Sequence, residues 1–187
     1  RELSVGAGLR SAQLRVSALG VYQAELNGSV VGDEVLAPGW TSYGHRIRLA
    51  THEVTDLLRE GSNAIGITVA EGWYRGRIGF AGGRRELYGT EIGPVAELHL
   101  AYEDGTTDVI ATDTSWRAST GEILSASLYD GEHVDARLRE PGWSRPGFDD
   151  SSWHPVVELP SVSARLHRPM GPPVRATDER PVVEVIT

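Results

Sequence analysis

Short runs of alternating apolar and polar residues, joined by glycine turns, restrict the possible folds of this chain more than any other feature. Residues 21–26 (Val-Tyr-Gln-Ala-Glu-Leu) form such a run. Because successive side chains of a strand point to opposite faces, this run predicts a half-buried strand. Asn27-Gly28 follows and predicts a tight hairpin, since a type I′ turn needs positive φ twice. Asp104-Gly105 separates two further runs, 96–102 and 106–110, and predicts a second hairpin of this kind.

Helix signals are almost absent. Thr55 can cap a short helix over 56–60, and Gly61 can end it. Residues 64–69 predict another strand. Many short strands with glycine-rich turns and one or two short helical turns predict an all-β jelly-roll β-sandwich.

The 187 residues suit one domain with a tail. We predict a β-sandwich domain over 1–158 and a proline-rich strap or linker over 159–187 that leads into a further β domain. Residues 181–186 of this tail predict one more strand. The sequence starts at Arg1 without an initiator methionine and is expected to be a fragment of a longer protein.

Composition excludes several function classes. The net charge is −8, which disfavours nucleic acid as a partner. The chain contains no cysteine, so disulfides and thiolate metal sites are excluded. No apolar run reaches the roughly 18 residues of a membrane span, and no membrane partner is expected. The sequence leaves the cellular compartment undecided.

No catalytic site is expected in this chain. A glycosidase needs two carboxylates across a sugar bond, and the 26 acidic residues supply chance pairs that sequence cannot place. The run Phe148–Trp153 indicates a turn with side-chain caps before a buried Trp. The six histidines show no metal-ligand spacing, and no nucleophile motif is present.

The loop from Gly72 to Gly89 combines aromatic rings with arginines, the side chains that meet the CH face and the hydroxyls of a sugar. Asp33-Glu34 lies close in sequence to Trp40 and offers carboxylates for hydroxyls or for Ca²⁺. The alternative interpretation is that Trp40 and Trp73 are core residues and that the arginines only solvate a surface.

A series of motifs resembles the N-terminal β-sandwich domain of bacterial α-L-rhamnosidases, the enzymes of glycoside hydrolase family 78. The series runs in family order from about residue 10 to 155. Its members are Ala18–Tyr22, Leu26–Asp33, Leu36–Tyr43, Val54–Leu58, Gly72–Arg77, Leu87–Gly89, Thr112–Trp116, Tyr129–Arg137 and Gly142-Trp143.

The resemblance implies a galactose-binding-like jelly roll that serves as a non-catalytic accessory domain. The parent enzyme would hydrolyse terminal α-L-rhamnose with inversion, using acids on a later (α/α)₆ barrel outside this chain. The expected partners are an L-rhamnose-containing glycan and the parent's other domains.

In some members of the family, a domain of this type binds L-rhamnose together with Ca²⁺. The resemblance places such a site on the Gly32-Asp33-Glu34 turn and the facing Gly72–Gly89 loop. Asp33 and Glu34 would hold the ion, although Glu34 stands where an amide would suit the sugar better. The expected carbohydrate ligands are Asp33, Glu34, Trp73, Tyr74, Arg75, Arg77 and Tyr88.

Two functions therefore compete, and a third, a self-sufficient hydrolase, would require hydrolysis by this chain itself. A sugar-binding module predicts Asp33 and the loop aromatics exposed together. A structural module that braces the parent's barrel predicts buried Trp40 and Trp73 and an apolar patch where the barrel would sit. The charged run Tyr129–Arg137 is expected to be a loop that docks neighbouring domains, with Glu132, Asp135 and Arg137 in interdomain ion pairs.

Overall fold

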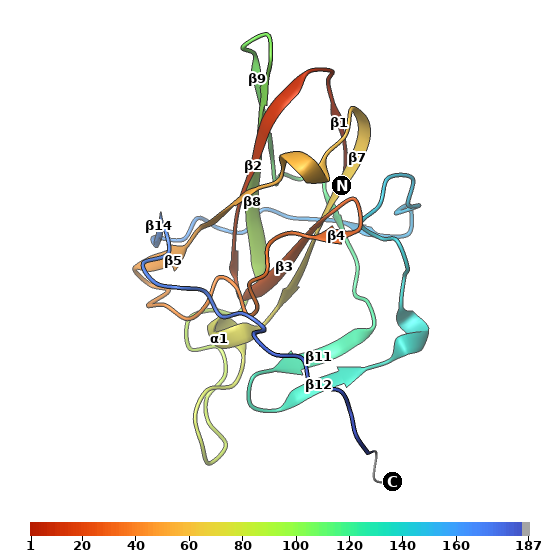
Figure 1. The fold of residues 1–187 in the computed structure, drawn as a ribbon. Helices are drawn as coiled ribbons and strands as arrows, with labels where there is room; N and C mark the ends of the chain where they lie inside the picture. The colour runs from red at the N-terminus through yellow and green to blue at the C-terminus, as the bar shows by residue number, and fades with distance from the viewer. Residues whose placement is uncertain (185–187) are drawn as a thin grey trace.

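The computed structural model describes residues 1–184 as a β-sandwich (Figure 1). One antiparallel sheet has the strand order β1-β7-β3-β4, and the other has the order β6-β2-β8-β9. The strands of the first sheet are β1 (Glu2–Val5), β7 (Gly61–Ala70), β3 (Val21–Leu26) and β4 (Ser29–Val30). Those of the second are β6 (Ala50–Glu53), β2 (Leu9–Leu19), β8 (Gly93–Tyr102) and β9 (Thr107–Ala111). The predicted β-sandwich is confirmed.

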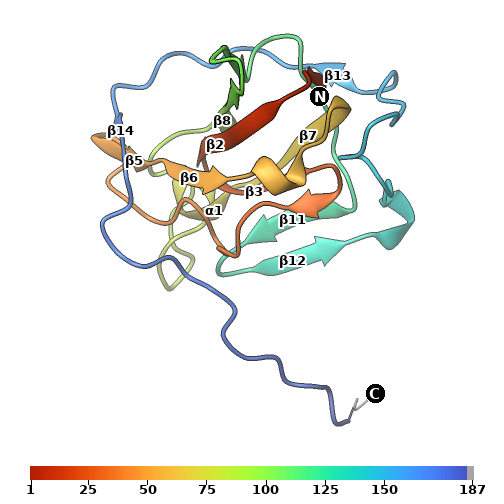
Figure 2. The same cartoon turned by 45° about the horizontal axis from the view of Figure 1, so that its top comes forward.

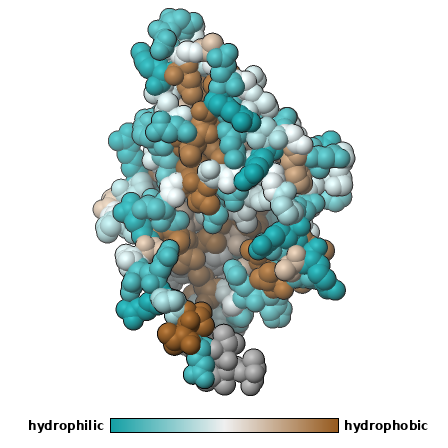
Figure 3. Space-filling view, turned by 45° about the vertical axis from the view of Figure 1, so that its right-hand side comes forward, coloured by the Kyte–Doolittle hydropathy of each residue, from teal (hydrophilic) through white to brown (hydrophobic). Residues whose placement is uncertain are grey.

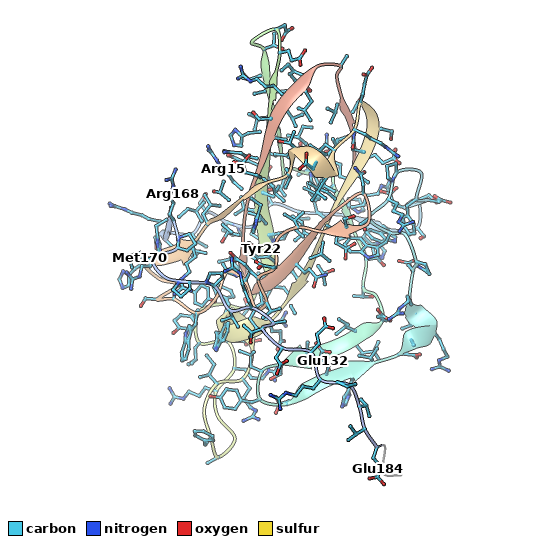
Figure 4. The ribbon with its side chains drawn as sticks, in the orientation of Figure 1. Arg15, Tyr22, Glu132, Arg168, Met170 and Glu184 are labelled. Atoms are coloured by element: carbon cyan, nitrogen blue, oxygen red, sulfur yellow. The ribbon has the colours of Figure 1, made fainter. Side chains whose placement is uncertain are left out.

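Alternating side chains of the two sheets meet in one core. Leu14 on β2 and Leu98 on β8 are fully buried, as are Leu26 on β3 and Ile65 on β7. Tyr22 lies between the sheets, in the middle of Figure 4, and its hydroxyl donates to the carbonyl of Val16 at 3.4 Å.

Gly20 lets the chain pass from one sheet to the other. It has φ +131°, and a Cβ there would lie 2.3 Å from the carbonyl oxygen of Ala70. Only glycine accepts both conditions, so β2 can end in one sheet and β3 can begin in the other after a single residue.

Both predicted hairpins are present, with different turns. Asn27 (φ 54°) and Gly28 (φ 82°) give the type I′ turn between β3 and β4. Between β8 and β9, only Gly105 has positive φ, and the N–H of Tyr102 bonds to the carbonyl of Thr106. The second turn is therefore one residue longer than the tight turn predicted at Asp104-Gly105.

The helical segments differ from the prediction. The helix predicted over 56–60 is only a 3₁₀ turn, η1 (Thr55–Leu57), and Gly61 begins β7. Thr55 does not cap it, because its hydroxyl accepts the N–H of Ala12 on β2 at 2.9 Å. The expected loop after β7 opens with a single helical turn, α1 (Gly72–Arg75), and η2 (Ala136–Leu138) is another 3₁₀ turn.

The remaining strands form small pairs outside the sandwich. They are β5 (Arg46–Arg48) with β14 (Arg165–His167) in parallel, β10 (Arg117–Ala118) with β13 (His154–Pro155), and β11 (Ile123–Ser127) with β12 (Gly131–Val134). The run expected as a docking loop, Tyr129–Arg137, is thus mostly the turn and second strand of a hairpin. Glu132 lies on this hairpin, below the sandwich (Figure 4).

The chain after residue 158 follows the surface and then leaves it (Figure 2). It forms β14 beside β5, and its last described residues extend away from the body. Residues 181–184 of the predicted last strand have no strand structure, and 185–186 lie outside the described residues. The boundary at 158/159 stays a prediction. Within residues 1–184, no helix is long and apolar enough to cross a membrane.

A buried amide network ties the start of β7 to the turn after β3. Asn63 is fully buried; its amide nitrogen donates to the carbonyls of Arg59 (2.6 Å) and Gly61 (2.9 Å). Its amide oxygen accepts the side chain of Asn27 at 2.8 Å. Every polar atom of this side chain is satisfied, which is the condition for burying it at low cost.

We expect Asn63→Ala to lower the free energy of unfolding by about 2–4 kcal/mol, because Asn27 and two backbone carbonyls would lose a buried partner. Urea unfolding followed by circular dichroism measures the change. The exposed neighbour Ser62 provides the control, and Ser62→Ala should stay within about 0.5 kcal/mol of the original chain. Equal stability of the two variants would show that the network contributes nothing.

Candidate functional site

The Gly32-Asp33-Glu34 turn projects from the end of β4 and carries the first pair of predicted site residues. The Asp33 side chain is 68% exposed, and its carboxylate accepts the guanidinium of Arg175 at 2.7 Å. The backbone of Glu34 forms an isolated bridge with that of Arg175, and the N–H of Val35 donates to the carbonyl of Val174. The C-terminal strap therefore lies directly on the turn.

His52 lies beneath this turn. A Cβ added at Gly32, which has φ +77°, would come within 2.8 Å of the imidazole, so the backbone and the ring are in close contact. Burial lowers the pKa of His52 below its ordinary 6.5, and the charges of Glu34 and Asp33 act in the opposite direction. The imidazole is therefore neutral at pH 7 and can serve as one donor and one acceptor.

The predicted aromatic residues gather in a second group. Trp73, at the first turn of α1, stacks on Trp40 with ring centroids 6.2 Å apart and an interplanar angle of 6°. The indole N–H of Trp40 donates to the hydroxyl of Tyr88 at 3.1 Å. Tyr74 and Tyr88 both pack against the ring of Tyr43.

The aromatic rings of this group differ in how much of each side chain is exposed to solvent. Tyr74 is buried and Trp73 is half-buried, whereas Trp40 is 48% exposed. Trp40 thus offers one flat indole to solvent, backed by a second one. The expectation that Trp40 is a core residue is wrong, and the expectation for Trp73 holds only in part.

The predicted arginines make ion pairs within the domain. Arg75 lies 3.7 Å from Glu71 and from Glu86. Arg77 binds Asp130 of the β11–β12 turn at 2.6 Å and lies over the ring of Tyr129. This hydrogen bond lowers the pKa of Asp130, which stays ionised. Arg75 and Arg77 therefore position the Gly72–Gly89 loop.

The structure accordingly divides the seven predicted residues into three groups: Asp33 with Glu34, the aromatic rings, and the paired arginines. Within residues 1–184, no hydrogen bond or ion pair joins the Asp33-Glu34 turn to either of the other groups. Arg175 and His52 were not predicted from the sequence. A proline-rich tail carries no signal for the first, and an isolated histidine in a strand carries none for the second.

The turn offers a calcium ion two carboxylates, those of Asp33 and Glu34. Calcium takes six to eight oxygen ligands, and residues 1–184 contain no group of three or more His, Cys, Asp or Glu side chains that could hold a metal. The guanidinium of Arg175 already neutralises Asp33. A cation at Asp33 would first have to displace Arg175.

The charged residues expected to pair with other domains lie in or just after β12. Asp135 binds Arg137, two residues away, at 2.6 Å, and the Arg137 side chain stays exposed. Glu132 is exposed on β12. Asp149 accepts the N–H of Ser151 in the predicted side-chain-capped turn, and Trp153 after it is half-buried.

Comparison with known proteins places the chain in one family. The family described as the α-L-rhamnosidase N-terminal domain matches residues 7–178. An α-L-rhamnosidase of Streptomyces avermitilis is 42% identical over 175 residues, which are 93% of this chain and 17% of that protein.

Two solved structures support the same assignment. The α-L-rhamnosidase of Aspergillus terreus superposes with a TM-score of 0.87 at 47% identity, over 94% of this chain and 20% of its own. The Streptomyces avermitilis α-L-rhamnosidase complexed with L-rhamnose gives a TM-score of 0.89 at 39% identity, over 94% of this chain and 17% of its own. The chain thus spans a fifth or less of each of these relatives, and it belongs to the α-L-rhamnosidase N-terminal domain family.

Proposed function

We propose that this domain is a non-catalytic accessory module of an α-L-rhamnosidase and that it binds carbohydrate, L-rhamnose foremost, at the Asp33 turn. The parent enzyme would hydrolyse terminal α-L-rhamnose, and the domain would hold the glycan. One observation carries the proposal: an exposed carboxylate and an exposed guanidinium lie 2.7 Å apart on the surface, with neutral His52 beneath.

This arrangement suits the hydroxyls of a sugar. A carboxylate accepts hydrogen bonds from adjacent hydroxyls, and a guanidinium donates to their oxygens in a planar fork. Because both groups are largely solvated, each would exchange water for sugar hydroxyls at low cost, which is typical of weak, reversible binding. A Streptomyces avermitilis relative has been solved in complex with L-rhamnose, which supports the choice of sugar.

Sugar binding at the Asp33 turn could depend on calcium or be independent of it. Asp33 and Glu34 are the metal ligands expected from the sequence, and Arg175 is the group that an ion would displace. Calcium-dependent binding would thus require the strap to move away from Asp33, whereas calcium-independent binding would use Arg175 in place of an ion.

A purely structural role is the second candidate, and one observation favours it. The β11–β12 hairpin and the turn after it expose apolar side chains to solvent, namely Ile123 (43%), Leu124 (61%), Val134 (54%) and Leu138 (49%). Exposed apolar side chains gathered on one hairpin and the turn after it are what a surface covered by another domain would present.

Calorimetric titration with L-rhamnose tests the binding role. We expect millimolar affinity, equivalent to about −4 kcal/mol, and at least a tenfold loss in Asp33→Ala because the acceptor of the hydroxyls is removed. The matched control is Asp56→Ala, which removes another exposed acid, in this case from η1. Running each titration with excess Ca²⁺ and with EDTA separates the two modes of binding. Absence of heat in both buffers would refute the binding role and leave the structural one.

The variant Arg175→Ala tests whether Arg175 binds the sugar or only competes with an ion for Asp33. If Arg175 contributes donors to the sugar, its removal weakens binding in EDTA by a similar factor. If Arg175 only blocks an ion, the variant binds L-rhamnose more tightly in excess Ca²⁺, and its affinity for L-rhamnose in EDTA is unchanged. Strengthened binding in EDTA would contradict both.

His52 gives the site a pH dependence of stability. Its pKa is lower in the folded chain than in the unfolded one, so unfolding takes up a proton between the lowered value and about 6.5. The free energy of unfolding should therefore rise as pH rises through this window and level off above about 7. The variant His52→Gln should flatten this rise of the free energy of unfolding with pH. The control variant His133→Gln, which changes an exposed histidine on β12, should leave the rise unchanged. An unchanged slope in His52→Gln would show that burial does not perturb this imidazole.

A further inference from the structure

The two asparagines of this chain, Asn27 and Asn63, bond to each other in the network that ties β7 to the turn after β3. Asn27 precedes Gly28, and glycine has no Cβ to keep its backbone nitrogen away from the neighbouring side chain. That nitrogen can therefore attack the amide carbon of Asn27. Asn63 precedes Ala64, whose Cβ hinders the same attack. Asn27 is thus the asparagine of this sequence that is more prone to lose its amide group.

The reaction, deamidation, needs only water as a co-reactant. The backbone nitrogen of Gly28 loses its proton and forms a bond to Cγ of Asn27, while the bond from Cγ to Nδ2 breaks and ammonia leaves with that proton. Water then opens the succinimide ring at one of two C–N bonds. Opening at Cγ gives aspartate, and opening at the main-chain carbonyl gives isoaspartate, whose main chain runs through Cγ. One water enters, one ammonia leaves, and nothing is oxidised or reduced.

In the folded chain, the amide group of Asn27 is fully engaged. Its Nδ2 donates to the carbonyl of Leu57 and to the side-chain oxygen of Asn63, both at 2.8 Å. Its Oδ1 accepts the N–H of Ala64 at 2.9 Å. The amide group must break these hydrogen bonds before it can turn toward the backbone nitrogen that attacks it.

The attacking nitrogen is held as well. The N–H of Gly28 donates to the carbonyl of Ser144 at 3.1 Å, and Ser144 is buried. A hydrogen bond of this kind stabilises the protonated nitrogen and so opposes the loss of its proton. The side chain of Arg145 packs against Gly28, since a Cβ added there would lie 3.0 Å from the Cγ of Arg145.

Water is close to this turn although the turn is held shut. Asn27 and Gly28 are half-buried, and β4, which follows them, is exposed. Strand β4 lies to the right of centre in Figure 1, on the side of the molecule that Figure 3 brings forward. Hydrophilic side chains cover much of the surface in Figure 3. The hydrogen bonds of the turn, rather than a lack of water, therefore keep the two reacting groups apart.

We propose that Asn27 is a deamidation site that the fold keeps closed, so that the chain reacts there only while it is unfolded. The contacts that hold the turn reach η1, β7 and residues 144–145. Because β7 lies inside the first sheet, between β1 and β3, breaking these contacts requires the sheet itself to unfold. The rate of the folded chain is then the rate of the unfolded chain multiplied by the unfolded fraction.

Neither product can restore the network. A carboxylate at residue 27 has no N–H to donate, and it would face the carbonyl of Leu57 and the side-chain oxygen of Asn63, which are both acceptors. Isoaspartate would lengthen the main chain within a two-residue turn and so disturb the pairing of β3 with β4. Deamidation during a brief unfolding event would therefore make the loss of structure permanent.

Mass spectrometry of the tryptic peptide 16–46, in which Asn27 is the one asparagine, tests the proposal. The folded chain and the chain in urea above its unfolding midpoint are incubated in the same mildly alkaline buffer, and fragment ions locate the change at residue 27. The free peptide 16–46, incubated in both solutions, corrects for the effect of urea on the chemistry. We expect at least about a hundredfold faster deamidation in the unfolded chain. Rates within about threefold of each other would overturn the proposal.

Two variants separate the network from general stability. Val16→Ala removes buried volume on β2 and should speed deamidation of Asn27 only in proportion to the unfolded fraction, which urea unfolding measures. Asn63→Ala should exceed that proportion, because it also frees the Asn27 amide in the folded chain. A proportional rise in Asn63→Ala would show that the network gives no protection. An unchanged rate in Val16→Ala, despite a larger unfolded fraction, would show that the reaction does not require unfolding.

The permanence of the damage is tested on Asn27→Asp, which carries one of the two products. This variant should unfold at a lower urea concentration than the original chain, whereas Ser62→Ala should not. Equal midpoints for Asn27→Asp and the original chain would contradict the expected loss of structure. Sugar binding plays no part in this chemistry, so the outcome is independent of the calorimetric titration.

Discussion

Apolar packing between the two four-stranded sheets is the interaction on which the rest of the domain depends. Leu14 and Leu98 from one sheet meet Leu26 and Ile65 from the other, and all four are fully buried. Full burial of side chains of this size stabilises by about 1.5–3 kcal/mol each. Everything else, including the loops that carry the candidate site, is attached to this core by single strands and turns.

The loops differ in how firmly they are attached. The Gly72–Gly89 loop is held by aromatic contacts to Tyr43 and by the ion pair of Arg77 with Asp130. The Asp33 turn is held by the strap through Arg175 and by its contact with His52. Surface ion pairs contribute little on their own, so we expect the aromatic contacts to hold the Gly72–Gly89 loop more firmly than Arg175 holds the Asp33 turn.

Local patterns predicted the strands because alternation and turn residues are local properties. The run 21–26 and the turn at Asn27-Gly28 are present as predicted. The helix over 56–60 failed because the hydroxyl of Thr55 bonds to Ala12 on β2, a partner that is distant in sequence. Tertiary partners of this kind override local propensity.

The candidate site was harder to predict for the same reason. Membership of the family followed from ordered motifs, and the match over residues 7–178 confirms it. The contact of Asp33 with Arg175 joins two segments 142 positions apart, one of them in a tail without periodicity. The sequence left open whether Trp40 lies in the core or on the surface, and only the structure shows its side chain 48% exposed.

The contact between Arg175 and Asp33 has a thermodynamic consequence for the path of the chain. A ligand that competes with Arg175 for the carboxylate must release this part of the strap, and anything that holds the strap in place weakens such a ligand by the same factor. A ligand that bridges both groups would instead fasten the strap. Ligand binding at the Asp33 turn is thus thermodynamically coupled to the position of the strap, and with it to the direction in which the polypeptide leaves the domain.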